Sequence, residues 1–393
     1  MRREPARPDI ASPLGSEPAI PLHRPHFGPE EEEAAHAVLA SGRLSGGGVW
    51  LEKAEALLRA RTGARHALLT SSCTHALETA ALALAIAPGD EVIVPSWGFP
   101  TSASAFLRQG ARIVFADSRP DDPEVDLDDV MRRVTPRTRA IVLVHYAGRP
   151  CDAPALRERL GDDVIAIVED AAQAFDARLR GRACGTLGTI GCISFHGTKN
   201  LTCGEGGVFL TDDDDIAHRA SLIREMGTDR RLFLHGEVSR YSWRTLGSSY
   251  LPPEISAAIL CAQIEKADRI LERRLAVADR YHQRFAEAQR RGDLFLPRRA
   301  PDGESNGHIY WVAFRSQERR DRAARALAAV GVEASSHFHP LDASPFGQVL
   351  HGGLRALPNA ERFHRCLLRL PIYPDLGETE QELVMATLLA SLG

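Results

Sequence analysis

The chain has 393 residues, with 48 Lys or Arg, 52 Asp or Glu and a formal net charge of −4. Hydrophobic residues make up 44% and charged residues 25%, which is ordinary for a globular protein and excludes a disordered chain. The sequence has no basic excess to neutralise phosphates, which argues against a nucleic-acid-binding protein. The length predicts about two or three domains, large enough to bury a core without disulfides or metal.

The seven cysteines are an odd number, and no two of them form a Cys-x-x-Cys pair. A disulfide framework or a zinc ribbon is therefore disfavoured. The sequence has no run of about 18 apolar residues, and no apolar leader follows Arg2-Arg3, so we expect a soluble, cytoplasmic protein. Residues 1–19 contain four prolines and no periodicity, which predicts a flexible N-terminal arm.

The first predicted helix covers residues 30–41, where glutamates follow Pro29 and face the positive end of the helix dipole. A glycine-rich loop at 45–48 separates it from a second helix at 50–62, which Gly63 ends.

Residues 66–211 alternate short apolar runs with helical segments, which predicts a doubly wound α/β domain. Continuous apolar runs are typical of strands buried on both faces, and helices between them imply right-handed crossovers and a mainly parallel sheet. The intervening helices are predicted at 74–86, 101–109 and 153–160. The seven predicted strands are 66–72, 90–96, 111–117, 139–145, 164–170, 191–196 and 206–211.

A smaller α+β unit is predicted after the sheet. The acidic run 212–215 is interpreted as a solvated loop, and Pro252-Pro253 opens a long helix over about 253–289. We expect a large domain at 20–265 and a small one at 266–393. The small domain is predicted to contain strands at 308–314 and 333–336 and helices at 317–330 and 378–392.

Ligands in open α/β sheets bind at the carboxyl ends of the strands, so the residues found there carry the functional argument. The first strand ends in Thr70-Ser71-Ser72-Cys73-Thr74, which also starts a helix, and free backbone N–H groups there form a phosphate cradle. The second strand leads to Trp97 and Phe99, an aromatic pair that by itself indicates only core packing.

The fifth strand ends in Glu169-Asp170, two carboxylates that are costly to bury unless they are paired. The sixth leads to Lys199, an unusual position for a residue that is mostly found on solvated surfaces. A cradle, an aromatic ring, a buried Asp and a Schiff-base Lys are what a pyridoxal phosphate site needs. A Rossmann nucleotide-binding enzyme is the alternative, but no Gly-x-Gly-x-x-Gly follows the first strand.

Three long motifs resemble the DegT/DnrJ/EryC1/StrS family of sugar-nucleotide aminotransferases. They are GDEVIVPSWGF (89–99), VEDAAQ (168–173) and SFHGTKNLTCGEGG (194–207). The resemblance extends from about residue 20 to the C-terminus. It implies a fold-type-I aminotransferase that uses pyridoxal 5′-phosphate, with pyridoxamine phosphate as an intermediate form, and a homodimer with active sites at its interface.

The resemblance also implies roles for individual residues. Lys199 takes the position of the Schiff-base lysine, and Asp170 takes the position of the residue that pairs with the pyridine nitrogen. Gln173 lies near the position of the ring hydroxyl, and Phe99 takes the ring-stacking position. The positions that hold the cofactor phosphate are occupied by Ser72, Cys73, Thr74 and Ser194. Cys73 replaces a common glycine.

A narrower resemblance points to the branch of dTDP-4-keto-6-deoxy-D-glucose 4-aminotransferases. Its motifs are VHYAG (144–148), REMGTDR (224–230), YSWRTLGSSYL (241–251) and the region of His337. This branch implies L-glutamate as donor and a dTDP-linked 4-ketosugar as acceptor, giving a dTDP-4-amino-4,6-dideoxyhexose (galacto or gluco) and 2-oxoglutarate. The implied substrate contacts are Trp97, His196, Tyr241, Trp243, Arg244 and His337.

The sequence departs from the family pattern at three places. Ser249 stands where the wider family has an Asn that reaches the neighbouring subunit's phosphate, and Leu251 replaces an Arg. Asp342 stands where this branch tends to carry a His. The pair His337 and His339 resembles a metal site, but no third ligand is near, so we predict no metal.

Three alternatives stay open at this point. A 3-ketosugar aminotransferase would differ only in the acceptor, and a non-catalytic regulatory member of the fold would lack turnover. A sugar dehydrase or deoxygenase of this family replaces the lysine with His, and Lys199 argues against it.

Overall fold

The computed structural model describes residues 19–161, 164–234, 236–299, 302–351 and 357–393. The arm predicted for residues 1–19 lies outside these ranges except for its last residue. No helix in the described parts of the chain combines the length and the apolar character needed to cross a membrane.

A seven-stranded sheet forms the centre of the molecule, and the seven predicted strands are confirmed. Its strand order is β1-β9-β8-β5-β4-β2-β3, and β9 alone runs antiparallel to its neighbours β1 and β8. The other pairs are parallel, so most carboxyl ends lie at one edge. The strands are β1 His66–Thr70, β2 Glu91–Pro95, β3 Arg112–Ala116, β4 Thr138–Val144, β5 Ala166–Asp170, β8 Ile190–Ser194 and β9 Gly207–Thr211.

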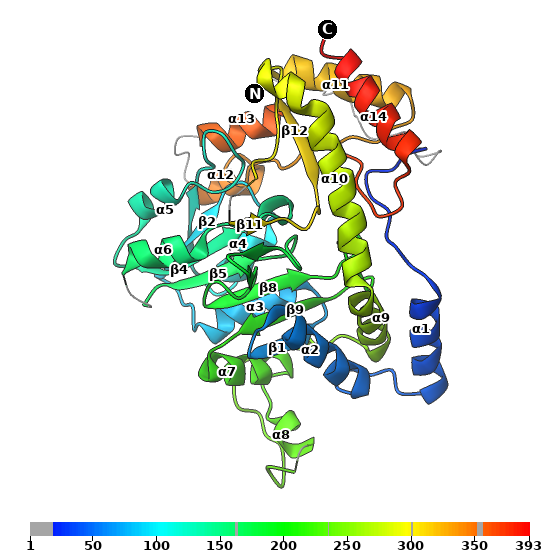
Figure 1. Ribbon diagram of the computed structural model, residues 1–393. Helices are drawn as coiled ribbons and strands as arrows, with labels where there is room; N and C mark the ends of the chain where they lie inside the picture. Colours follow the sequence, from blue (N-terminus) through cyan, green and yellow to red (C-terminus); the bar gives the residue numbers. More distant parts are fainter. Residues whose placement is uncertain (1–18, 162–163, 235, 300–301, 352–356) are drawn as a thin grey trace.

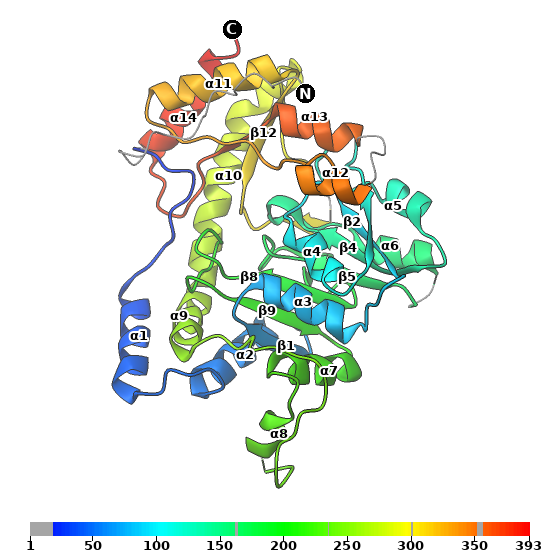
Figure 2. The same cartoon turned by 180° about the vertical axis from the view of Figure 1, so that it is seen from behind.

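Helices cover both faces of this sheet (Figures 1 and 2), because every strand presents buried residues on both sides. One apolar core joins the sheet to α2, α5, α6 and α9 (Glu254–Glu265), and the other joins it to α3, α4 and α7. The helices are α1 Pro29–Ser41, α2 Val49–Thr62, α3 Cys73–Ala83, α4 Thr101–Leu107, α5 Leu127–Arg133, α6 Ala153–Leu160, α7 Asp214–Arg224 and α8 Arg230–Leu234.

The interpretation of residues 212–215 as a loop is wrong, because α7 starts inside this acidic run. Asp213 is its N-cap, and its Oδ1 accepts a hydrogen bond from the Ile216 N–H at 2.8 Å. Asp214 and Asp215 occupy the first turn, where the helix dipole favours negative charge.

The single helix predicted over 253–289 is also wrong, because the structure has two helices there. They are α9 Glu254–Glu265 and α10 Ala267–Arg290, with Lys266 between them in a non-helical conformation. The Lys266 ammonium is buried and forms an ion pair with Glu31 of α1 at 2.7 Å, which fixes the break. The predicted domain boundary falls at this break.

We call the described residues from 267 onward the C-terminal unit. Its three-stranded sheet has the order β10-β12-β13, and its core lies against α10. The strand predicted at 333–336 is wrong: Ser335 forms only an isolated bridge with Arg369, and the third strand is β13. Besides α10, the elements are β10 Leu294–Phe295, β11 Gly303–Glu304, β12 Tyr310–Phe314, β13 Leu367–Leu370, α11 Gln317–Ala329, α12 Pro345–His351, α13 Pro358–Cys366 and α14 Glu378–Ala390. Strand β11 pairs with β6 Arg178–Leu179, which pairs in turn with β7 Arg182–Ala183.

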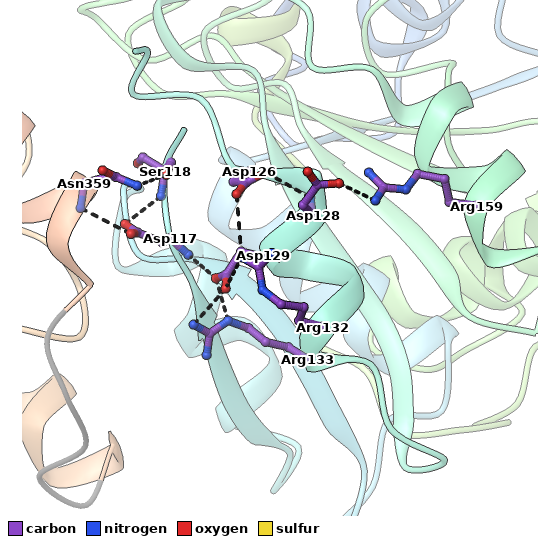
Figure 3. A network of polar contacts seen from close by, with 9 residues as sticks. All are labelled: Asp117, Ser118, Asp126, Asp128, Asp129, Arg132, Arg133, Arg159 and Asn359. Atoms are coloured by element: carbon purple, nitrogen blue, oxygen red, sulfur yellow. Dashed lines mark hydrogen bonds and ion pairs between the residues drawn. The ribbon is translucent and has the colours of Figure 1, made fainter. Parts of the chain in front are cut away.

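A carboxylate at the end of β3 attaches the C-terminal unit to the large sheet (Figure 3). Asp117 accepts hydrogen bonds from the first-turn N–H groups of Asn359 at 3.2 Å and Ala360 at 2.9 Å. It thereby caps α13 from a distance of more than 240 residues in sequence. Asp129 holds the Asp117 N–H at 2.8 Å and pairs with Arg133 at 2.6 Å. This junction fixes one side of the space between the two parts of the molecule.

Candidate active site

A cavity of about 720 Å³ lies at the carboxyl edge of the large sheet and is closed on its other side by the C-terminal unit. Most of the predicted site residues face this one cavity. The large sheet and its loops contribute Ser72, Cys73, Thr74, Phe99, Thr101, Val144, Asp170, Ala172, Gln173, Ser194, His196, Thr198, Lys199 and Glu205. The remaining lining residues are Leu22, His23, His308, Ile309, Glu333, His337, Phe338, Arg369, Leu370 and Ile372.

The start of α3 forms an anion-binding end of the cavity. Ser72 is the N-cap, and its hydroxyl accepts from the His75 N–H at 3.1 Å. The N–H groups of Cys73 and Thr74 belong to the first turn, which leaves them without acceptors inside the helix. A side chain at Gly207 would meet the backbone of Ser72 and Cys73 at 2.4 Å, so only glycine lets β9 pass this close.

Asp170 forms the floor of the cavity at the end of β5. Its carboxylate accepts hydrogen bonds from the Ser102 hydroxyl and from the Ala172 N–H at 3.1 Å. Gln173 is fixed beside it, because its side-chain carbonyl accepts from the Ala147 N–H at 2.7 Å. Both side chains are therefore held in place before any ligand enters.

Lys199 follows β8 and lies in a short loop, where its N–H donates to the His196 carbonyl at 2.9 Å. Burial lowers the pKa of the Lys199 ammonium, and this effect outweighs the attraction of Cys73 and Asp170. A neutral amine is a nucleophile and a base, so the cavity favours the reactive form. Burial has the opposite effect on Cys73 and raises the pKa of its thiol.

The two aromatic residues after β2, Trp97 and Phe99, lie in different environments. Phe99 is 57% exposed although it lines the cavity, so its ring is free to contact a ligand. Trp97 does not line the cavity; it is buried and packs edge-on against Tyr146 and Phe338 at ring distances of 5.6 and 5.8 Å. Trp97 supports the wall behind the cavity.

His337 lines the cavity, and its Nδ1 lies 3.3 Å from the Tyr146 hydroxyl. Burial, together with the charges of Arg369 and Lys199, lowers its pKa to about 2, so the ring is neutral. His339 instead packs edge-on against His364. The described residues contain no group of three or more His, Cys, Asp or Glu side chains arranged to hold a metal ion.

Four predicted contact residues lie outside this cavity, in the segment from Met226 to Ser249 that carries α8. Figure 1 shows α8 projecting away from the body of the molecule. Tyr241 is 51% and Trp243 75% exposed, and Arg244 pairs with Asp229 at 2.6 Å. Ser249 forms a bridge with Glu225. The structure does not bring these residues to the cavity of their own chain.

Apart from His337, sequence reasoning missed the cavity residues of the C-terminal unit and of the N-terminal segment. The most informative is Arg369 on β13, whose guanidinium donates to the Ser335 hydroxyl at 2.9 Å while its buried Nε has no partner. Burial lowers its pKa, and within the described chain no carboxylate lies within 4 Å of it. The alternation of Arg369 with buried leucines is the sequence signal for this strand, but four residues are too few to identify it.

These features define a class of protein. A parallel sheet whose carboxyl edge presents an anion-binding helix start, an exposed aromatic ring, a fixed carboxylate and a low-pKa lysine suits pyridoxal phosphate. The chain belongs to the DegT/DnrJ/EryC1/StrS aminotransferase family, whose model matches residues 25–389.

Two relatives are similar over nearly the full chain. The dTDP-4-dehydro-2,3,6-trideoxy-D-glucose 4-aminotransferase of Saccharopolyspora spinosa is 31% identical over 369 residues, covering 92% of this chain and 94% of that protein. The GDP-perosamine synthase of Caulobacter vibrioides is 32% identical over 376 residues, covering 94% of this chain and 98% of that protein.

Solved structures that are similar to this chain are also aminotransferases. The aminotransferase TlmJ of Streptoalloteichus hindustanus is 31% identical, with a TM-score of 0.87 over 95% of this chain and 98% of that one. The sugar aminotransferase Spr1654 of Streptococcus pneumoniae, 25% identical with a TM-score of 0.87, has been solved in forms with pyridoxal and pyridoxamine phosphate. These forms cover 95% of this chain and 97–98% of Spr1654. The protein is therefore a pyridoxal-phosphate-dependent sugar aminotransferase with a fold-type-I architecture.

Proposed function

We propose that the enzyme transfers the amino group of L-glutamate to C4 of dTDP-4-keto-6-deoxy-D-glucose. The products are 2-oxoglutarate and a dTDP-4-amino-4,6-dideoxyhexose. The observation that carries this proposal is that Lys199 and Asp170 face one cavity from neighbouring strands, with burial lowering the pKa of the lysine.

When bound, pyridoxal phosphate supplies an electron sink that stabilises the carbanion formed at the donor Cα. The start of α3, with Ser72, Cys73, Thr74 and Ser194, binds the phosphate through N–H and hydroxyl groups. Asp170, Gln173 and Phe99 line the same cavity. Asp170 would keep the ring nitrogen protonated, Gln173 would hold the ring hydroxyl and Phe99 would contact the ring.

Lys199 moves the protons of both half-reactions. As a neutral amine it removes the proton from the donor Cα, and in the second half-reaction it delivers a proton to C4 of the sugar. His337 and His196 line the cavity and would contact the sugar. Binding of the distant nucleotide diphosphate positions C4 against Lys199.

Arg369 binds a carboxylate of the donor in this proposal. A buried guanidinium without an ion-pair partner is costly, and an entering carboxylate supplies the missing charge and the acceptor for Nε. Arg369→Gln is expected to raise KM for glutamate about 10–100-fold, the range for a lost hydrogen bond to a charged group. KM for the nucleotide sugar should change little, and equal increases in both constants would contradict this role.

The choice of a dTDP-linked 4-ketosugar rests on the name of the Saccharopolyspora relative, which acts on a dTDP-linked 4-ketosugar, and on the branch motifs. The Caulobacter relative is named for a GDP-sugar, so the nucleotide needs a direct test.

We also propose that the enzyme is a cytoplasmic homodimer with active sites at its interface. The segment that carries α8 exposes apolar side chains and reaches away from its own cavity, with Leu246 64% and Trp243 75% exposed. A partner subunit would cover these side chains and receive Tyr241, Trp243, Arg244 and Ser249 at its own site. All seven cysteines are free and buried, as a reducing compartment favours.

The test is coupled detection of 2-oxoglutarate with purified enzyme, pyridoxal phosphate and glutamate. We expect release of 2-oxoglutarate when dTDP-4-keto-6-deoxy-D-glucose is added and much less with the 3-keto isomer or with a GDP-linked 4-ketosugar. Preference for the 3-keto isomer would establish the alternative acceptor, and failure with every ketosugar would support a non-catalytic protein.

A further inference from the structure

The N-terminal segment Ile20–Gly28, which we call the strap, connects the C-terminal unit with the cavity. Figures 1 and 2 show it in dark blue, running from the C-terminal unit to α1. Leu22 and His23 line the cavity together with Lys199, so the strap is part of the wall of the site. No residue of the strap was among the predicted site residues.

Backbone hydrogen bonds attach the first half of the strap to the C-terminal unit. The Ile20 N–H donates to the Gly331 carbonyl at 3.1 Å, and the Glu333 N–H donates to Ile20 at 2.9 Å. The Leu22 N–H donates to the Glu333 carboxylate at 2.9 Å, and the Leu22 carbonyl accepts from Ile372 at 3.2 Å. Both neighbours of this half belong to the C-terminal unit, whereas the His26 carbonyl in the second half accepts from the side chain of Gln263 in α9 at 2.8 Å. The strap therefore joins the C-terminal unit to the large domain.

The side chain of His23 contacts the loop of the large domain that carries Lys199. Its Nε2 donates to the Gly197 carbonyl at 3.2 Å, two residues before Lys199. A side chain at Gly197 would meet nothing closer than 3.9 Å, so little packs against this residue. After Lys199 the loop is held at Asn200, whose side chain donates to the Asn306 carbonyl at 2.8 Å and contacts His308 Nδ1 at 2.8 Å. The hydrogen bond from His23 restrains the loop on the side that precedes Lys199.

His23 is suited to this task because its ring stays neutral. Burial, assisted by the charge of Arg274, lowers its pKa to about 4, with smaller contributions from Lys199 and His196. A neutral ring has one N–H, and the contact with a carbonyl places it on Nε2.

We propose that His23 is a positioning residue for the reaction: through Gly197 it fixes the loop that carries Lys199, and the strap couples this loop to the C-terminal unit. The proposal rests on Lys199 being the reacting amine of the proposed function. Loss of the hydrogen bond displaces the amine relative to the donor Cα, and small displacements of reacting groups are costly.

The test compares His23→Leu, which removes the donor, with His23→Gln, whose amide N–H can take its place. His26→Leu is the matched control, because His26 lies in the same strap but is bonded to Asp375 at 2.7 Å, away from the cavity. For each holoenzyme we would measure kcat, both KM values and the pH midpoint of the absorbance band of lysine-bound cofactor. Thermal unfolding would establish that each variant is folded.

We expect His23→Leu to lower kcat about tenfold or more, with little change in either KM. The absorbance midpoint should shift by about 0.5 pH unit or more, because the surroundings of the amine change. His23→Gln should recover most of the wild-type kcat and most of the wild-type absorbance midpoint. His26→Leu should match the wild type in both.

Two results would overturn the proposal. One is a wild-type kcat and midpoint in folded His23→Leu; the other is equal impairment of His23→Leu, His23→Gln and His26→Leu, which would show that the strap only supports the fold. A wild-type protein that forms no absorbance band would instead refute the proposed function, so the two failures are distinguishable.

Discussion

The two adjacent carboxylates at the end of β5 have different tasks, and replacing Glu169 with Gln tests this separation. Glu169 is fully buried, and each of its oxygens accepts two hydrogen bonds. Oε2 accepts from His145 Nε2 at 2.7 Å and from the Gly185 N–H at 2.8 Å. Oε1 accepts from the N–H groups of Leu187 at 2.7 Å and Gly188 at 2.6 Å. Glu169 thus holds a loop together and faces away from the cavity that Asp170 lines.

The expected loss of stability follows from these four hydrogen bonds. A Gln side chain has one oxygen and one NH2 group, so one pair of N–H donors would face another donor. Two hydrogen bonds to a charged group, each about 1.5–3 kcal/mol, give a loss of about 3–6 kcal/mol. This is a large part of the roughly 5–15 kcal/mol that stabilises a typical protein. Burial lowers the pKa of His145, but Cys184 and then Glu169 raise it above its usual value, so the substitution disturbs the ring as well.

The assay is urea unfolding followed by far-UV circular dichroism. Glu169→Gln should unfold at a clearly lower urea concentration than the wild type. The control is Glu272→Gln on the exposed face of α10, which should change stability by no more than about 0.5 kcal/mol. Equal midpoints for Glu169→Gln and the wild type would refute the argument that this carboxylate is structural.

The remaining predictions concern the cavity. Lys199→Ala should abolish both turnover and the absorbance band of lysine-bound cofactor, and retention of either would remove Lys199 from its role. Asp170→Asn should stay folded but lose at least about 100-fold in kcat, measured by 2-oxoglutarate release, because Asn holds no proton on the ring nitrogen. The pKa values of His23 and His337 fall from 6.5 to about 4 and about 2 on folding. The unfolded chain therefore binds protons at these two histidines at a higher pH than the folded protein does. The folded protein has its full stability above pH 6.5. As the pH falls from 6.5 toward 4, each histidine lowers the free energy of unfolding by about 1.4 kcal/mol per pH unit. Urea midpoints at pH 7 and 5 should show this loss, and it should be smaller in His23→Gln.

The large sheet was predictable because its strands are buried on both faces. Turn residues or a helix separate each apolar run from the next, so the local sequence pattern was enough to predict all seven strands. The C-terminal unit was less predictable. The break at Lys266 depends on an ion pair with Glu31, 235 residues away, and β13 has only four residues. Long-range contacts of this kind leave no periodic signal in the sequence.

The same distinction applies to the cavity. Residues at the carboxyl ends of strands, such as Asp170 and Lys199, were found because topology alone brings them to one edge. Arg369 and His23 reach the cavity only through the packing of the C-terminal unit and the strap, so local sequence patterns do not assign them to the cavity. The acidic run at the start of α7 shows why composition alone does not assign a segment, because the same residues suit a loop and a helix start.

In the proposed reaction, nitrogen from glutamate arrives at C4 of a dTDP-linked sugar. Incubation of the enzyme with 15N-labelled glutamate and dTDP-4-keto-6-deoxy-D-glucose, followed by NMR of the product, tests this directly. We expect a 15N–C4 bond in the product, and the coupling between H3 and H4 will then assign the galacto or gluco configuration. A 15N label at C3, or no label in any sugar product, would contradict the proposed reaction.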